Sequence, residues 1–512
     1  MIPYVPDEIL SAIFSHLLTP SQRHHCRDDW HHDSTQVRLV CRRWNAIATK
    51  CLLGTLVLRH SGITMNDKFR AWHKLVDSKR LRPDVRRVAI ETAILVEDPS
   101  SINHGTCEVF RWPESWREGV WPEFESAINR IRHLPKLDAI EVRFTAACIG
   151  RVGEIQRNHQ MNRMGESLDT TPVEEPTNTR LHTLQALARA IQERNKRPNV
   201  STVRELVLEN LQNVPILDSV ATDLLQNIER LHIKILSEAD DESFYFTPTT
   251  PIERMYREEI RLFPRSLEND ILDLVPNLVE LTLAGKNWAA IPGAFYGMDV
   301  ILPRLNTLTL EGFEILHKWH FDWVLRHKSL RSLNLHRCTI ATHCLVQQPE
   351  FGFWGVNLDG WIRVQDDTHD PDHLHQVPIA YTPMPDDDEP GWYVSPLRWD
   401  TLFDSISENL PLLESFTFDA KEWENYFRHV DYPFSSFPEI GFRYSCFAHI
   451  WSFLQRWPWC SKASSDCINN CQYVEAGVLG SPELLPDLTE QADSQALEKL
   501  LQTVKGRRNA GR

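Results

Sequence analysis

The sequence lacks the features that would place it on a nucleic acid, in a membrane or outside the cell. Its 512 residues carry a formal net charge of −15, whereas nucleic-acid-binding proteins usually present a basic face. No stretch approaches the roughly 18 apolar residues that a membrane span needs, and the first ten residues lack the basic and apolar segments of a secretory signal. The eleven cysteines are therefore expected to be reduced thiols in the cytoplasm or the nucleus. We expect no nucleic acid and no membrane among its partners.

Catalytic motifs are missing as well. There is no Gly-x-Ser-x-Gly elbow, Walker phosphate loop or Gly-x-Gly-x-x-Gly turn. Potential metal ligands do not form the Cys-x-x-Cys-like pairs typical of structural zinc. They fall into three groups: His24, His25, Cys26, His31, His32 and Asp33; His369, Asp370, Asp372, His373 and His375; and Cys460, Cys467 and Cys471. An exposed loop is a poor place to hold catalytic groups in fixed geometry. The sequence thus predicts a non-enzyme without cofactor or metal, with a metal-dependent hydrolase using residues 369–375 as the remote alternative.

What the sequence does contain is material for a large core. Apolar residues make up 42% of the chain, including 17 tryptophans and 22 phenylalanines. This length and composition are typical of two to four folded domains.

Two short stretches near the start have the periodicity of amphipathic helices. Pro6, Asp7 and Glu8 suit a first helical turn, because proline has no N–H to leave unpaired there and acidic side chains favour the positive end of a helix. Apolar side chains then recur at helical spacing: Ile9, Leu10, Ile13, Phe14 and Leu17, followed by Val37, Val40, Cys41, Trp44 and Ala48. Helices this short are marginal in water, and each exposed apolar side chain forgoes roughly 1.5–3 kcal/mol. Either the rest of the chain or a second protein is expected to cover them.

The residues themselves resemble the F-box of fungal-type F-box proteins. The family pattern of Leu-Pro, Glu-Ile-Leu, Ile-Phe and Val-Cys-x-x-Trp is matched, in order, around Pro6, Leu10, Phe14 and Trp44. Val5 stands where leucine is usual, and a polar insertion at residues 22–33 leaves the middle of the motif unaligned. The resemblance implies a three-helix F-box over residues 1–50. Its implied partners are the adaptor subunit of a cullin–RING ubiquitin ligase and, through it, the cullin scaffold. The implied adaptor-binding residues are Pro6, Ile9, Leu10, Ile13, Phe14, Leu17, Val40, Cys41 and Trp44, without distinguishing those that touch the adaptor from those that hold the helices together.

After residue 53 one apolar pattern returns nine times: an apolar residue, two variable ones, an apolar one, one variable, an apolar one. Clear copies begin at Val203, Ile228, Leu278, Leu305 and Leu330, and weaker copies begin at Leu53, Val85, Leu137 and Leu413. An ordinary α/β sheet also gives apolar alternation, but the recurring interval of about 25 residues lies within the leucine-rich-repeat range. The predicted fold class is therefore α/β, with the three-helix F-box followed by an irregular leucine-rich-repeat-like solenoid of one strand and one helix per repeat.

In such a strand, alternate residues point away from the core. The outward positions form a possible target-binding face: Arg230, His232, Lys234, Glu280, Thr282, Thr307, Thr309, Glu311, Ser332, Asn334 and His336. A polar, extended face suits protein recognition, although solvent exposure alone would also explain its composition.

The solenoid is expected to occupy residues 51–425, with polar insertions near 150–180, 239–270 and 345–396. Residues 426–512 would form a C-terminal cap, with a short helix at Leu497–Leu501 that ends in a disordered basic tail.

These features predict an interaction protein. In the first hypothesis it is the substrate receptor of an SCF-type ubiquitin ligase, whose F-box binds the adaptor and whose repeats bind an unknown target protein. In the alternative the chain is a ligase-independent scaffold, and the N-terminal helices only cap its repeats.

Overall fold

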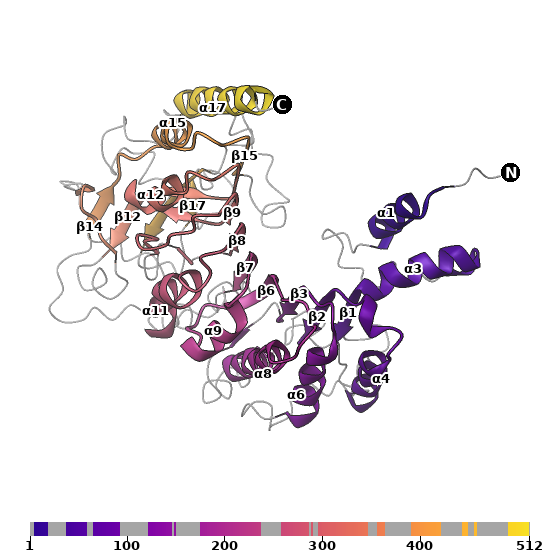
Figure 1. The fold of residues 1–512 in the computed structure, drawn as a ribbon. Coiled ribbons are helices and arrows are strands. Elements are labelled where there is room, and N and C mark those ends of the chain that lie inside the picture. The colour runs from indigo at the N-terminus through magenta and orange to yellow at the C-terminus, as the bar shows by residue number, and fades with distance from the viewer. Residues whose placement is uncertain are drawn as a thin grey trace, which may run out of the picture. The chain divides into compact units, whose positions relative to one another are not determined.

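The computed structural model describes residues 5–18, 37–58, 65–92, 121–145, 148–149, 175–236, 258–285, 288–289, 295–346, 356–363, 391–420, 443–448, 455–457 and 490–510 (Figure 1). The chain divides into two compact units. The first contains residues 1–145 and 158–208, and the second contains residues 146–157 and 209–512.

Nine strands form a parallel sheet in the order β1-β2-β3-β6-β7-β8-β9-β11-β15. Their bounds are β1 Thr55–Leu58, β2 Arg87–Glu91, β3 Ala139–Arg143, β6 Glu205–Gln212, β7 Arg230–Leu236, β8 Glu280–Ala284, β9 Thr307–Glu311, β11 Ser332–His336 and β15 Ser415–Asp419. Each of the nine apolar patterns found in the sequence begins two residues before one of these strands. The prediction of an α/β fold with an N-terminal helical region is therefore confirmed, together with a parallel sheet.

The strands alternate as the pattern requires. Leu281 and Leu283 of β8 are fully buried, while Glu280 and Thr282, which alternate with them, are half-buried. Leu308 and Leu310 of β9 repeat this arrangement in register with them. Stacking equivalent leucines on neighbouring strands buries one continuous apolar face, which stabilises units that could not fold alone.

In the first unit the helices are α1 Asp7–Leu18, α3 Arg42–Gly54, α4 Met65–Asp77, α6 Pro122–Asn129 and α8 Thr177–Asn195, with short 3₁₀ turns η1 Arg82–Asp84 and η3 Arg130–His133. Figure 1 shows α4, α6 and α8 following one another along strands β1 to β3. Trp72 of α4 donates to the Ala127 carbonyl of α6 over 2.8 Å. The buried Arg194 of α8 donates to the carbonyls of Leu134 and Leu137, which ties this helix to the turn before β3.

In the second unit the helices are α9 Asp218–Leu225, α11 Glu258–Ser266, α12 Trp319–Arg326, α15 Trp399–Asn409 and α17 Glu490–Ala510, and η7 Leu267–Leu272 is π-helical. A second, mixed sheet has the order β13-β14-β12-β16-β17, and β10 pairs with β12. Its strands are β10 Glu314–Ile315, β12 Thr339–Val346, β13 Ile362–Arg363, β14 Gly391–Val394, β16 Tyr444–Ala448 and β17 Gln455–Trp457. The short strands β4 Cys148–Ile149 and β5 Glu175–Pro176 complete the described elements.

The structure describes elements within each of the three predicted insertions. Residues 175–180 hold β5 and the start of α8, where the buried Glu175 accepts from the Thr145 backbone N–H over 3.1 Å. Residues 258–270 are helical, and Ile260, Phe263 and Leu267 bury an apolar side there. The 345–396 segment contains β13 and β14, which pair with each other and, through β14, with β12. In the third segment the structure describes residues 345–346, 356–363 and 391–396, and the remainder of the three segments lies outside the described residues.

The C-terminal end also differs from the prediction. The expected five-residue helix and disordered basic tail are one helix of 21 residues, α17, which lies beside α15 (Figure 1). Leu500 and Val504 are buried, and the "tail" residue Arg507 donates to the Ser407 and Leu410 carbonyls near the end of α15. A cation there satisfies carbonyls that α15 leaves unpaired and complements its negative end.

Candidate functional site

The N-terminal helices α1 and α3 form the first candidate site. Helix α1 begins with the predicted proline and acidic pair, and the Leu10 N–H donates to the Pro6 carbonyl over 3.1 Å. Arg43 of α3 reaches back to this first turn, where it donates to Asp7 Oδ1 over 2.7 Å and to the Val5 carbonyl. These bonds fix the start of α1 against α3.

Helix α3 starts at a cysteine cap. Cys41 has an extended backbone, and its sulfur accepts from the Trp44 N–H over 3.4 Å. Residues 37–39 form a single helical turn before it. The segment of the predicted three-helix F-box between residues 19 and 36 lies outside the described residues, so the structure describes two of the three expected helices together with this turn.

Side chains from both helices form a small apolar cluster. Leu10, Phe14 and Ala48 are buried, and Val5, Val37, Trp44, Ile47 and Cys51 pack partly buried against them. The Phe14 and Trp44 rings meet edge to face, with centroids 5.2 Å apart, an arrangement that aromatic pairs favour. This cluster holds the two helices together.

Another set of apolar side chains in the same helical region faces outward. Ile9 is 52% exposed, Ile13 45%, Leu39 74% and Val40 59%. We call these four residues the N-terminal apolar surface. Among the described residues, eleven large apolar side chains are exposed, and four of them are these. Such a concentration within a few dozen residues marks a candidate protein-binding surface.

The nine predicted adaptor-binding residues therefore separate into groups. Ile9, Ile13, Val40 and Pro6 are exposed, as direct contact with a partner requires. Leu10 and Phe14 are 4% and 1% exposed and belong to the internal cluster that holds the helices together. Cys41 is exposed and caps α3, and Trp44 is half-buried beside Phe14. The side chain of Leu17 lies outside the described residues. Leu39 was not predicted, although its apolar character next to Val40 was visible in the sequence.

The outward face of strands β7 to β15 is the second candidate site. The register aligns its predicted residues in three rows. Arg230, Glu280, Thr307 and Ser332 form the first row, His232, Thr282, Thr309 and Asn334 the second, and Lys234, Glu311 and His336 belong to the third. All eleven side chains are half-buried or exposed. Strand β15, whose outward positions were not predicted, extends the rows with Ser415, Thr417 and Asp419.

Hydrogen bonds connect the middle row across the strands. His232 Nδ1 lies 2.9 Å from Thr282 Oγ1, and Asn334 Nδ2 donates to Thr309 Oγ1 over 3.1 Å. Arg337, which follows β11, pairs with Glu311 in the third row. The face thus combines hydroxyl, amide and imidazole groups that can both donate and accept.

The outward face of the first unit has a different character. Arg87 of β2 pairs with Glu205 of β6 and lies 3.6 Å from Glu141 of β3. Arg143 pairs with Glu141 and with Glu91 at 2.5 and 2.9 Å. Here the charged side chains neutralise one another.

Buried titratable groups have internal partners. Burial raises the pKa of Glu268, whose carboxylate accepts from the Tyr296 and Gly297 backbone N–H groups and holds that segment against η7. Burial also raises the pKa of Glu175, which accepts from Thr92 Oγ1 over 2.8 Å and lies 3.6 Å from Arg180 Nε. These bonds give both groups structural roles.

No cluster of three or more metal-ligating side chains occurs among the described residues. The groups at residues 24–33, 369–375 and 460–471 lie outside that part of the chain. Among the helices that the structure describes, none combines the length and apolar content of a membrane crossing.

Comparison with known families agrees with the geometry of the first site. A family profile described as F-box-like matches residues 2–53, about a tenth of the chain and the span of α1 and α3. No curated protein matches the chain. An F-box-like domain thus occupies residues 2–53, and F-box domains generally bind Skp1-type adaptor proteins. This domain indicates a role in protein interaction of the F-box type.

Proposed function

We propose that this chain is the substrate-recognition subunit of an SCF-type cullin–RING ubiquitin ligase. The F-box-like domain would bind the adaptor and, through it, the cullin scaffold, while the sheet holds a target protein. The observation that carries the proposal is the exposure of Ile9, Ile13 and Val40 within a segment that matches the F-box-like profile. A partner that covers these side chains removes apolar area from water, which is the main driving force of association.

The proposal treats the nine-stranded sheet as a degenerate leucine-rich-repeat-like solenoid. Its support is the recurrence of one apolar pattern, which begins two residues before every strand, with intervals near 25 residues between several copies. A solenoid of this kind offers an extended face made of many repeats. The three rows of β7, β8, β9 and β11 are the part of that face that we assign to target binding.

In this proposal the chain performs no chemistry and holds no cofactor. Its contribution is to hold a target near the ligase, which raises the effective concentration of the target without any new reactive group. We further propose that it acts in the cytoplasm or the nucleus. The thiols of Cys41 and Cys344, which form no disulfide with a described residue, are consistent with a reducing compartment.

Co-purification tests the adaptor step. The full chain and a variant without residues 1–53 are each incubated with a purified Skp1-type adaptor, and complex formation is measured by size-exclusion chromatography and calorimetry. The full chain should form a one-to-one complex and the truncated chain none. Absence of a complex with the full chain would overturn the proposal.

The scaffold alternative is favoured by one observation, the direct continuity of α3 with the sheet. Helix α3 ends at Gly54 and β1 begins at Thr55, and the Gly54 carbonyl accepts from the Arg86 N–H over 2.9 Å. Helices joined in this way could serve only to cap β1. In that case the chain without residues 1–53 should unfold at a markedly lower temperature, and the intact chain should not bind the adaptor.

A further inference from the structure

A pocket in the first unit lies where α3 meets the start of the sheet. Lys50, Cys51 and Gly54 line it from the last turns of α3, and Pro83 and Asp84 line it from η1. Arg86, Lys136 and Ser11 complete the lining. The cavity has a volume of about 250 Å³, roughly eight times the volume of one water molecule in the liquid. It is therefore large enough for a small polyatomic ligand.

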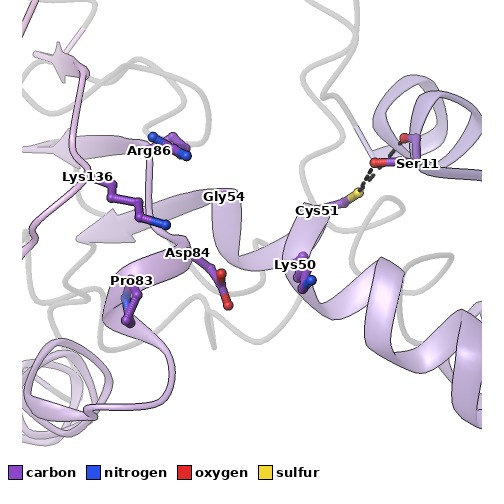
Figure 2. A pocket seen from close by; sticks show the side chains of 8 residues that line it. All are labelled: Ser11, Lys50, Cys51, Gly54, Pro83, Asp84, Arg86 and Lys136. Carbon is purple, nitrogen blue, oxygen red and sulfur yellow. Dashed lines mark hydrogen bonds between the residues drawn. The ribbon is translucent and has the colours of Figure 1, made fainter. Parts of the chain in front are cut away.

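Three of the lining side chains are cations, Lys50, Arg86 and Lys136, and all three are exposed. Lys50 belongs to α3, Arg86 lies between η1 and β2, and Lys136 lies in the turn before β3. None of the three forms a side-chain hydrogen bond or ion pair with another described residue. In Figure 2 the Lys136 side chain extends in the direction of Asp84, the only carboxylate of the lining. Three cations and one carboxylate leave a formal charge of about +2 at this pocket.

The surrounding sequence has the same sign. Residues 37–92 contain thirteen lysines and arginines but only four acidic residues, in a chain whose formal net charge is −15. Like charges repel, so the three cations that line the pocket destabilise the free protein slightly and attract anions. The C-terminal end of α3 also borders the pocket, and its partial negative charge disfavours an anion. This charge is reduced because the Gly54 carbonyl accepts a hydrogen bond from the Arg86 N–H.

The neutral part of the lining is already occupied by internal contacts. Ser11 Oγ lies 3.8 Å from Cys51 Sγ, and this thiol also lies 3.9 Å from the Ser11 carbonyl (Figure 2). This contact joins α1 to α3 at one end of the pocket. The three cations are thus the groups that remain for a ligand.

We propose that this pocket binds a phosphate dianion. A phosphoryl group carries a charge of about −1.5 to −2 near neutral pH, which balances the charge of the lining, whereas a single carboxylate would leave about half of it unmatched. The guanidinium of Arg86 offers a fork of donors that fits two phosphate oxygens, and the two lysines supply point charges. The same chemistry can come from free phosphate or from a phosphorylated side chain. The site is separate from the N-terminal apolar surface and from the outward rows of the second unit.

The test uses the full chain and inorganic phosphate at pH 7.5 and constant ionic strength. Calorimetry should show saturable binding at one site, and acetate should bind at least about tenfold more weakly. Replacing Lys136 by alanine should weaken phosphate binding about tenfold or more, as expected for loss of a charge-assisted bond, and Lys136→Arg should largely retain it. The exposed Lys318 of the second unit provides a matched control, since Lys318→Ala should leave phosphate binding unchanged.

A second arm identifies the source of the phosphate. O-phosphoserine that binds more tightly than inorganic phosphate, while serine does not bind, assigns the pocket to a phosphorylated residue. Equal or weaker binding of O-phosphoserine assigns it to a free phosphate. The inference is overturned if inorganic phosphate shows no saturable binding, if acetate binds equally well, or if a Lys50→Ala, Arg86→Ala, Lys136→Ala variant binds phosphate as the native chain does. Because these side chains are exposed, circular dichroism should show the triple variant folded.

Discussion

Shortening Ile9 and Ile13 together to alanine is the change that most directly probes the N-terminal apolar surface. Both side chains project from α1 away from the internal cluster of Leu10 and Phe14. Alanine also favours a helix more than isoleucine does. The double variant should therefore fold as the native chain does, and any loss of binding reports on the surface itself.

The magnitude follows from how much of each side chain is still exposed. Each change removes about three methylene-sized groups, worth about 0.8 kcal/mol each when they leave water for an apolar contact. Because Ile9 is 52% and Ile13 45% exposed, half of this area remains available for a partner to bury. The expected loss of binding free energy is about 1 kcal/mol per residue, or about 2 kcal/mol for the pair, which raises the dissociation constant about thirtyfold.

The assay is calorimetry with a purified Skp1-type adaptor, with thermal unfolding of the free chain measured in parallel. Ile301→Ala is the matched control, since Ile301 is 75% exposed but belongs to the second unit. The Ile301→Ala variant should change neither the dissociation constant for the adaptor nor the unfolding temperature. If the double variant binds the adaptor within a factor of two of the native chain, Ile9 and Ile13 are not part of the interface and the reasoning from exposure is refuted.

Three further predictions concern the interior. Phe14→Ala should destabilise the helical region by about 3–5 kcal/mol, because it removes a buried ring that packs on Trp44; local hydrogen exchange measures this, and unchanged protection of α1 would contradict it. Asp493→Ala should lower the free energy of unfolding of the second unit by about 3–5 kcal/mol, because this fully buried carboxylate of α17 pairs with Arg443. Lys499→Ala, which removes an exposed pair on the same helix, should have little effect in the same denaturant titration, and equal effects would exclude an anchoring role for Asp493. Burial lowers the pKa of His320 to about 3 from its ordinary 6.5, so its contribution to stability is present above pH 6.5 and is lost as the pH falls toward 3. His320→Gln should therefore lose less stability than the native chain over that interval, and parallel pH profiles would contradict the assignment.

The strands of the main sheet were predictable because each one is determined by a few neighbouring residues in the sequence. Each strand is encoded by an apolar triplet, such as Leu305, Leu308 and Leu310, whose spacing alone assigns the buried face. The outward residues follow from the same alternation, so Thr309 and Asn334 could be placed on one face before their contact was known. The continuation of this face onto β15 was missed, although Leu413 had marked the strand.

The second sheet was not predictable in this way. Strand β12 pairs with β14, about fifty residues later in the chain, and with β16, about a hundred residues later. No periodicity connects segments that far apart, because their pairing depends on the whole packing of the unit. For α17 a signal existed, since Leu500 and Val504 have helical spacing. Its basic end was misjudged because the role of Arg507 depends on carbonyls of α15 that sequence reasoning cannot place.

The same limit explains the division within the F-box-like domain. Helical periodicity assigned Ile9, Leu10, Ile13 and Phe14 to one broad apolar stripe of α1. A stripe of this width is too broad for α3 alone to cover. Leu10 and Phe14 contact α3, which leaves Ile9 and Ile13 facing outward.

The apolar cluster between α1 and α3 is small, with three buried side chains. The helices therefore gain stability both from their junction with β1 and from any partner that covers the outward side chains. Binding of a partner stabilises the folded form in proportion to its concentration above the dissociation constant. The capping and receptor roles are therefore physically compatible in one pair of helices, and only the outward isoleucines, which contribute nothing to the cluster, distinguish them.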